Sequence, residues 1–160
     1  MGVARTGAER DAFFMRHAMA LARDAQAAGE VPVGAVLVLG DDVIGQGHNR
    51  PIGTCDPSAH AEVMALRDAG LRQQQYRFPE SELYVTLEPC AMCAGALIHA
   101  RVARVVYGAE DPKSGAAGGV MDVFGCDALN HRVELHSGVL AQDCAEQLRA
   151  FFRARRKKTG

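Results

Sequence analysis

Residues 84–108, YVTLEPCAMCAGALIHARVARVVYG, decide the fold of this chain. A run rich in β-branched and aromatic residues is followed by a short apolar helix, beginning just after Pro89, and by a second β-branched run. Strands that alternate with helices are typical of an α/β domain in which helices cover a sheet. The predicted helix begins with a Cys-x-x-Cys pair, Cys90 and Cys93, so the candidate chemistry lies within this segment.

The flanking sequence extends the alternation in both directions. Helices are predicted where apolar residues recur every three or four positions, and strands where apolar β-branched residues run together. The predicted elements are a helix over 9–30, a strand pair over 31–50 turning at Asp41 and Asp42, a helix over 59–70 with Ser58 as its N-cap, strands over 81–88, 101–108 and 131–139, a helix over 90–100, and a basic C-terminal helix from about 140 to 158. Residues 51–57 and 109–130 are predicted to be loops.

This order of elements predicts an α/β fold, a three-layer α/β/α sandwich with a five-stranded mixed sheet. The first strand is apolar almost throughout, so we expect helices on both of its faces. With 160 residues and no repeat or linker, the chain is predicted to form one domain over residues 1–160. The predicted buried stripes of the first and last helices are Phe14, Ala18, Leu21, Ala22 and Ala25, and Leu140, Cys144, Leu148 and Phe151 or Phe152.

Composition indicates an ordinary globular protein of the cytoplasm. Hydrophobic residues make up 48% of the chain and charged residues 23%. No stretch approaches the roughly 18 apolar residues of a membrane span, and the first residues lack the apolar core of a secretory signal. We therefore expect no membrane partner, a cytoplasmic location, and five cysteines that are reduced.

Charge is distributed unevenly along the chain. From Arg149 onward, RAFFRARRKKTG carries six basic residues and no acid, which leaves 12 basic against 19 acidic residues, a net charge of −7, for the rest. A basic tail on an acidic body is a common electrostatic footprint for phosphate binding, although a solvated terminus explains it equally well. The candidate phosphate contacts are Arg153, Arg155, Arg156 and Lys157.

The Cys90–Cys93 pair is compatible with three kinds of site. A thioredoxin-like redox pair should follow the first strand of the fold, whereas this pair follows the third. A structural zinc site needs four ligands, and the other three cysteines are isolated in the sequence. A catalytic zinc site needs only one further ligand and a general acid/base, and the stretch PSAHAEVMAL supplies His60 and Glu62.

The spacing of His60 and Glu62 sets a geometric condition on that third site. Residues i and i+2 in the middle of a helix point about 200° apart and could not face one metal ion. They converge only at a helix tip, where Asp56, Pro57 and Ser58 would place them. Since Cys90 also begins a helix, the sequence predicts two helix N-termini that face each other across a zinc ion.

Together, His-x-Glu and Pro-Cys-x-x-Cys match the signature of zinc-dependent nucleobase deaminases. The chain resembles the cytidine deaminase superfamily, and in particular its bacterial tRNA adenosine deaminases, from about residue 15 to 156. The resemblance rests also on VPVGAVLV, NRPIG, DPSAHAEVMALR, KSGAAG and NHRVE. It implies one Zn²⁺ per subunit, held by His60, Cys90 and Cys93, with Glu62 as the catalytic proton shuttle.

The resemblance also implies a substrate. In that family a zinc-activated hydroxide attacks C6 of the wobble adenosine, position 34 of an arginine tRNA anticodon, and inosine is formed. The implied base contacts are Asn49, Val33, Ala61, Leu87 and Asp111, and the implied partners are the tRNA anticodon stem-loop and a second copy in a homodimer. The metal motif also allows a deaminase of a free base or nucleotide (cytosine, guanine or a pterin-like compound).

Overall fold

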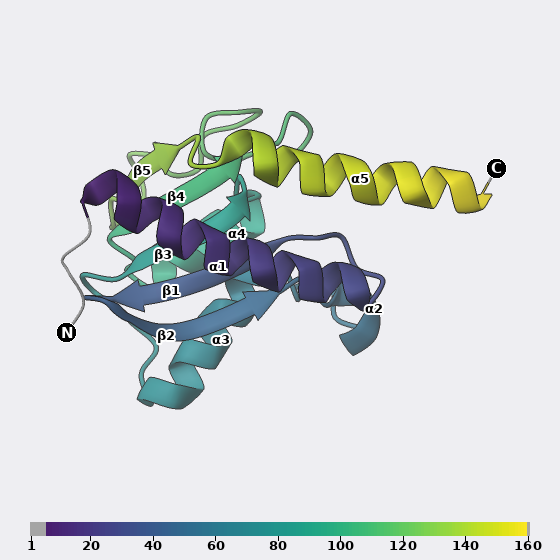
Figure 1. The fold of residues 1–160 in the computed structure, drawn as a ribbon. Helices are drawn as coiled ribbons and strands as arrows, with labels where there is room; N and C mark the ends of the chain where they lie inside the picture. The colour runs from purple at the N-terminus through teal and green to yellow at the C-terminus, as the bar shows by residue number, and fades with distance from the viewer. Residues whose placement is uncertain (1–5, 160) are drawn as a thin grey trace.

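A five-stranded sheet forms the middle layer of the molecule, in the order β2-β1-β3-β4-β5 (Figure 1). The computed structural model describes residues 6–159. The strands are β1 (Gly34–Leu39), β2 (Asp42–His48), β3 (Glu82–Leu87), β4 (Arg104–Ala109) and β5 (Glu134–Ser137). Strand β1 pairs antiparallel with β2 and β3, whereas β3, β4 and β5 are parallel. The predicted five-stranded mixed sheet is confirmed.

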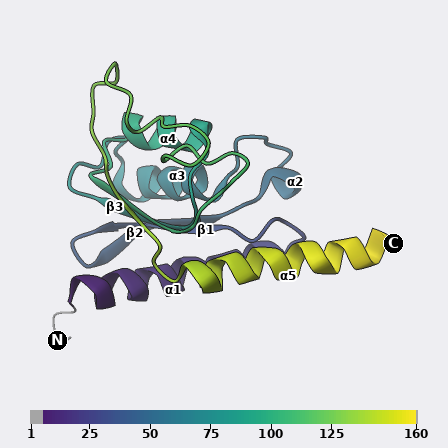
Figure 2. The same cartoon turned by 90° about the horizontal axis from the view of Figure 1, so that it is seen from above.

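Helices cover both faces of the sheet. They are α1 (Gly7–Ala27), α2 (Pro51–Thr54), α3 (Ala61–Gln73), α4 (Ala91–His99) and α5 (Ala141–Thr159). Helices α1 and α5 lie on one face and α3 and α4 on the other, as Figure 2 shows. The three-layer α/β/α arrangement predicted from the sequence is therefore confirmed.

Strand β1 separates two halves of the hydrophobic core. Ala35 and Leu37 pack into the half that includes α3 and α4, whereas Val36 and Val38 pack into the half that includes α1. All four side chains are fully buried, because successive residues of a strand point to opposite faces of the sheet. The prediction that both faces of this strand are covered is correct.

The two long helices bury the stripes predicted for them, with small differences. All five predicted residues of α1 are buried, and Thr6 with Glu9 forms a capping box at its start. In α5, Cys144 and Phe151 are buried, whereas Phe152 is 41% exposed. Leu140 precedes the helix at a positive φ, so it packs against the core from the turn and not from the helical stripe.

Two glycines of β2 bring α3 into direct contact with the sheet. A Cβ atom on Gly45 would lie 2.4 Å from the Ala65 carbonyl oxygen, and one on Gly47 would lie 2.6 Å from the Ala65 nitrogen. Opposite them, α3 presents alanines to the sheet at Ala61, Ala65 and Ala69, all fully buried. Because no side chain separates the two backbones, β2 fixes the position of α3 closely.

Three local predictions are wrong. The first turn lies at Gly40 and Asp41, because Leu39 pairs with Asp42 and Gly40 supplies a positive φ. Residues 51–54, predicted as loop, form the short helix α2, with Pro51 in its first turn. Ser58 is not the N-cap of α3, since its hydroxyl bonds the Asp56 carboxylate.

The N-cap of α3 is His60, and its capping interaction comes from a distant part of the chain. The N–H of Ala61, which has no partner within the helix, donates to the Asn49 side-chain oxygen at 2.9 Å. The sequence gives no local signal for this cap, because Asn49 lies twelve residues upstream.

The strand directions bring the functional segments to one edge of the sheet. Strands β2 and β3 are both antiparallel to β1, so they run the same way, and β4 runs with them. The segments that follow these strands, leading to α3, α4 and the loop after residue 109, therefore meet at that edge. Helix α5 projects beyond it (Figure 1). No helix within residues 6–159 has the length and apolar character needed to cross a bilayer.

Candidate metal centre and substrate cleft

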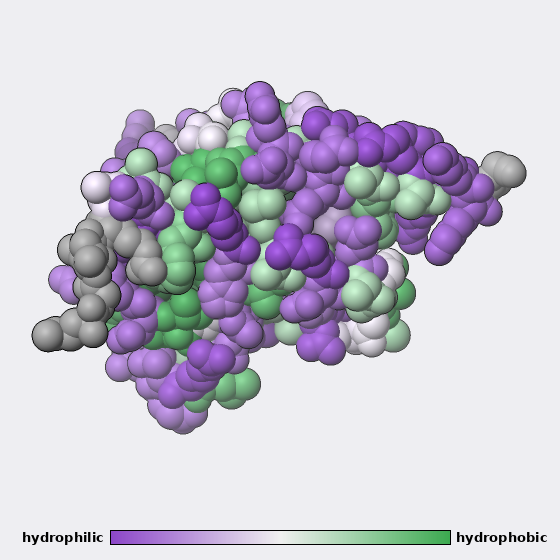
Figure 3. All heavy atoms as spheres, viewed as in Figure 1, coloured by the Kyte–Doolittle hydropathy of each residue, from purple (hydrophilic) through white to green (hydrophobic). Residues whose placement is uncertain are grey.

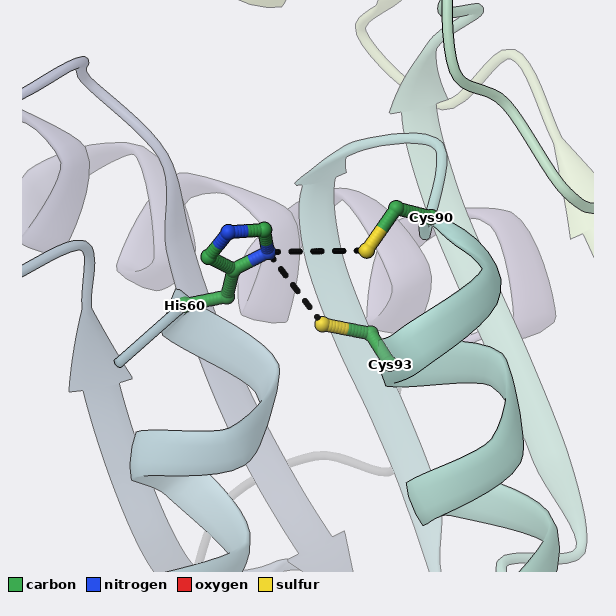
Figure 4. Close-up of side chains that lie close together, drawn as sticks. All are labelled: His60, Cys90 and Cys93. Atoms are coloured by element: carbon green, nitrogen blue, oxygen red, sulfur yellow. Dashed lines mark hydrogen bonds between the residues drawn. The ribbon is translucent and has the colours of Figure 1, made fainter. Parts of the chain in front are cut away.

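His60, Cys90 and Cys93 converge at the shared edge of the sheet (Figure 4). His60 is the N-cap of α3 and Cys90 the N-cap of α4, and Cys93 lies in the first turn of α4. The His60 Nδ1 atom is 3.5 Å from the Cys90 sulfur and 3.6 Å from the Cys93 sulfur. The predicted arrangement of two helix N-termini facing each other is confirmed.

The distances fit a tetrahedral zinc ion. With Zn–S bonds of about 2.3 Å and Zn–N bonds of about 2.0–2.1 Å, two tetrahedral ligands N and S lie about 3.6 Å apart. Both measured N···S separations agree with that value, and all three ligand atoms lie within 4.8 Å of one another. Three protein ligands leave a fourth position for water, as catalytic zinc sites require.

The electrostatics of the two cysteines favour a bound cation. A hydrogen bond from the Cys93 thiol and another with His60 lower the pKa of Cys90 to about 3, whereas the same shared proton raises the pKa of Cys93. Hydrogen bonding with Cys90 also raises the pKa of His60. A zinc ion allows both cysteine sulfurs to be thiolates, which are the ligands it prefers.

Glu62 lies beside these three ligands, and its side chain is only 4% exposed. The extended backbone of His60 (φ −76°, ψ 155°) breaks the helical relation between residues 60 and 62, so both can face one centre. Burial raises the pKa of Glu62 to about 7, and the nearby Cys90 thiolate adds to the effect. A carboxyl group in this range can both accept and release a proton near neutral pH.

Residues 8–109 match the family model described as the cytidine and deoxycytidylate deaminase zinc-binding region. This match covers more than half of the chain and contains all three ligands and Glu62. The chain belongs to this zinc-binding deaminase family.

This deaminase is similar over nearly its whole chain to tRNA-specific adenosine deaminases, and it belongs among them. It is 49% identical to the tRNA-specific adenosine deaminase of Haemophilus influenzae, over 99% of this chain and 92% of the relative. It is 43% identical to the tRNA-specific adenosine deaminase of Bacillus subtilis, over 93% of this chain and 92% of the relative. A solved structure from a study of A-to-I editing by tRNA:A34 deaminases has a TM-score of 0.83 and 43% identity, over 85% of this chain and 99% of the other.

Asn49 and Ala61, two predicted base contacts, are bonded to each other. The Asn49 side-chain oxygen accepts the Ala61 N–H, which fixes the amide and leaves its NH₂ group as the donor that a substrate could meet. The Asn49 backbone N–H is bonded to the Val33 carbonyl, so β2 and the segment before β1 hold it in place. Ala61 itself is fully buried and offers no exposed side chain.

The other predicted base contacts lie in different surroundings. Val33 is 4% exposed and packs in the core beside α3 and α4. Leu87 and Asp111 line a cleft of about 750 Å³, here called the α5 cleft, between the end of β3, the loop after β4, and α5. Its lining residues are Val31, Leu87, residues 109–114, Ala145, Leu148, Arg149, Phe152, Arg153 and Arg156.

The basic residues of α5 divide between this cleft and the outer surface. Of the four predicted contacts, Arg153 and Arg156 line the α5 cleft, whereas Arg155 lies over the Phe151 ring at 5.3 Å. Lys157 is exposed and is not part of the lining. In the view of Figure 3, hydrophilic side chains form the upper rim and the far end of the projecting part of α5, and more hydrophobic residues lie below that rim.

Four residues beside the site are missing from the sequence-based prediction. Arg149 and Phe152 line the α5 cleft, and Glu30 and Glu88 are carboxylates that are each 2% exposed. Glu30 accepts the N–H groups of Ile52 and Gly53 and so holds α2, and Glu88 accepts three N–H groups from the loop after β4. An acidic residue at the end of a buried, apolar strand was the available signal for Glu88.

Proposed function

We propose that this chain deaminates adenosine 34, the wobble position of an arginine tRNA anticodon, to inosine with the uptake of water and release of ammonia. The observation that carries the proposal is the His60–Cys90–Cys93 centre with Glu62 beside it, in a chain 49% identical to a tRNA-specific adenosine deaminase. The α5 cleft supports an RNA substrate, because three arginines and one exposed aromatic ring line it and its wall includes Leu87, three residues before Cys90 in the sequence.

Each residue has a role that follows from its position. A zinc ion held by the three ligands would supply a Lewis acid that lowers the pKa of water towards about 7. Glu62, buried beside the ligands, carries one proton from the attacking water to N1 of the adenine. It then carries a second proton, from the new hydroxyl group at C6, to the departing amine, which leaves as ammonia. Asn49 offers its NH₂ group to an acceptor on the base, and Leu87 with Asp111 faces the nucleotide from the cleft.

The anticodon loop is a suitable substrate because its bases are not held in a duplex. The target adenine must leave its stack to reach a buried centre, which costs least in a single-stranded loop. Flanking nucleotides would then lie in the α5 cleft, with Phe152 as a stacking surface and Arg149, Arg153 and Arg156 near phosphates.

The decisive experiment is incubation of the zinc-loaded protein with an unmodified arginine tRNA, followed by mapping of inosine by position. We expect inosine at position 34 alone, and none with Glu62→Gln, which should keep one zinc per chain. Absence of inosine together with turnover of free cytosine or guanine would overturn the proposal in favour of a free-base deaminase.

We also propose that the active form is a cytoplasmic homodimer. Apolar side chains are exposed on the face that carries α3 and α4, with Leu71 at 75% and Met92 at 39% exposure. Val120 and Met121, in the loop that passes along the same side, are also exposed. Sedimentation equilibrium at micromolar concentration should give twice the chain mass, and a monomer mass would contradict the pairing.

A further inference from the structure

Glu88 concentrates its hydrogen bonds on a single loop. Its Oε1 atom accepts the Asp111 N–H at 3.0 Å, and its Oε2 atom accepts the N–H groups of Ala117 at 2.9 Å and Gly119 at 3.1 Å. Among residues 6–159, no lysine or arginine forms an ion pair with this carboxylate, although its side chain is 98% buried. The backbone N–H groups of one loop therefore replace the hydration that the carboxylate loses on burial.

The loop is shaped around the carboxylate. A Cβ atom on Gly115 would lie 2.4 Å from the Glu88 carboxyl group, and one on Gly119 would lie 2.8 Å from its Oε1 atom. Only residues without a side chain can approach so closely. Next to these contacts, the Ala116 N–H donates to the Pro89 carbonyl at 2.8 Å, so the loop is bonded to the backbone between Glu88 and Cys90.

This loop is one wall of the α5 cleft. Residues 111–114 line the cleft, and Glu88 bonds the loop at both ends of residues 111–119. Glu88 follows β3 directly, and Cys90 follows two residues later. The wall of the cleft and the metal ligand are therefore fixed to the same strand end.

We propose that Glu88 is a positioning residue for substrate, acting through the loop 111–119. It holds Asp111 and the rest of the cleft wall at a fixed distance from the metal centre without touching the substrate. The inference rests on the proposed function, because it assigns the loop to nucleotide binding. Its kinetic consequence is specific: loss of the carboxylate weakens tRNA binding, whereas the zinc ligands and Glu62 keep their positions.

Glu88→Gln tests this inference with the smallest change of shape. An amide offers one oxygen in place of two, so it can satisfy only one end of the loop, and its NH₂ group opposes the N–H of the other end. Losing a charge-assisted hydrogen bond should raise KM for arginine tRNA about tenfold or more, with kcat changed by less than about threefold. Zinc content should stay at one ion per chain.

Glu82→Gln is the matched control, because it makes the same change at the opposite end of β3. Glu82 forms ion pairs with Arg10 at 2.7 Å and Arg104 at 2.8 Å, far from the cleft. It should lower stability and leave KM unchanged. If Glu88 only stabilised the fold, the two variants would behave alike, with lower melting temperatures and the same KM per zinc-loaded chain.

Gly119→Ala disturbs the contact between the loop and Glu88 from the loop side. It provides a second test if Glu88→Gln does not fold. Gly119 does not have a positive φ, so alanine acts through the 2.8 Å contact and not through backbone strain. The variant should also raise KM, and its effect should not add to that of Glu88→Gln. Amide hydrogen exchange should become faster across residues 111–119 in both variants and remain unchanged in Glu82→Gln.

The outcomes separate the inference from the proposed function. A wild-type protein that makes no inosine in tRNA overturns the proposed function. A wild-type protein that is active, with an unchanged KM in Glu88→Gln despite faster exchange of the loop, overturns the positioning role alone. Loss of zinc in Glu88→Gln would overturn it as well, because the residue would then act on the metal centre.

Discussion

Replacing Gly47 with alanine should push α3 away from β2 and thereby shift His60 relative to the two cysteine ligands. The added Cβ atom would lie 2.6 Å from both the Ala65 nitrogen and the Met64 Cβ atom, and 2.8 Å from the Ala61 carbonyl oxygen. Contacts between carbon atoms are most favourable at about 3.5–4.0 Å, so α3 must move away from β2 by about 1 Å. His60 is the N-cap of α3 and moves with it.

The magnitude follows from two opposing effects. Overpacking of a closely packed site costs about 1–3 kcal/mol. Alanine restricts the unfolded chain more than glycine does, which offsets about 0.5–1 kcal/mol of that cost. The free energy of unfolding should therefore fall by about 1–2 kcal/mol. Because metal–ligand distances tolerate only about ±0.2 Å, zinc affinity should fall about tenfold.

Urea unfolding of the zinc-loaded protein measures the first quantity, and competition with a chromogenic chelator measures the second. Gly7→Ala is the matched control, since nothing lies within 4 Å of its Cβ position, and it should change stability by less than about 0.5 kcal/mol. Wild-type stability and zinc affinity in Gly47→Ala would refute the reasoning that the glycine sets the position of α3.

Three further predictions concern other parts of the molecule. Phe151 is 8% exposed and Phe152 is 41% exposed. Phe151→Ala should therefore lower the free energy of unfolding by about 3 kcal/mol. Phe152→Ala should leave stability unchanged and weaken tRNA binding by about 1–3 kcal/mol in a filter-binding assay. Arg104 donates hydrogen bonds of 2.7 and 2.9 Å to the two carboxylate oxygens of Asp11, and Asp11→Asn leaves an acceptor for only one of them and removes the negative charge, so it should cost about 1–3 kcal/mol at pH 7. Burial acts to raise the pKa of Asp11, but hydrogen bonds from Arg104 and Tyr84 hold it below its ordinary value of 3.8. The stability that comes from this depressed pKa is present above about pH 4 and is lost as pH falls through the folded-state pKa. In urea titrations, the difference in stability between variant and wild type should therefore shrink in that acidic range. Cys93→Ser should reduce zinc content measured by elemental analysis, whereas Cys126→Ser, at an exposed position, should keep it; an equal loss in both would contradict the ligand assignment.

Local patterns were sufficient for most of the fold. The apolar periodicity of α1 and the β-branched runs of β1, β3 and β4 identify elements whose burial repeats with a fixed period. The wrong N-cap of α3 arises because a distant residue supplies the local interaction. Ser58 has the side chain of an N-cap, but Asp56 and Arg67 bond its hydroxyl, and Asn49 supplies the cap of α3 from another segment.

In the candidate site, too, some residues could be predicted from the local sequence and others depend on contacts with distant segments. His60, Glu62, Cys90 and Cys93 could be named from the sequence because a zinc deaminase needs these residue types at this spacing. For Glu88 the sequence offers only an acidic residue at the end of an apolar strand; it does not identify the partners, because these are backbone N–H groups, which every loop possesses. Nor could it divide the basic residues of α5 between the cleft and the outer surface.

By itself, the sequence determined the ligand set, the acid/base residue and the order of strands and helices, since these depend on residue type and local periodicity. Only the tertiary structure decided how the parts are placed. Two antiparallel pairings bring the ends of β2 and β3 to one edge, and Gly45 and Gly47 let α3 approach the sheet closely enough for His60 to reach within 3.6 Å of both sulfurs. Such distances depend on the packing of backbone against backbone, to which segments far apart in the chain contribute together.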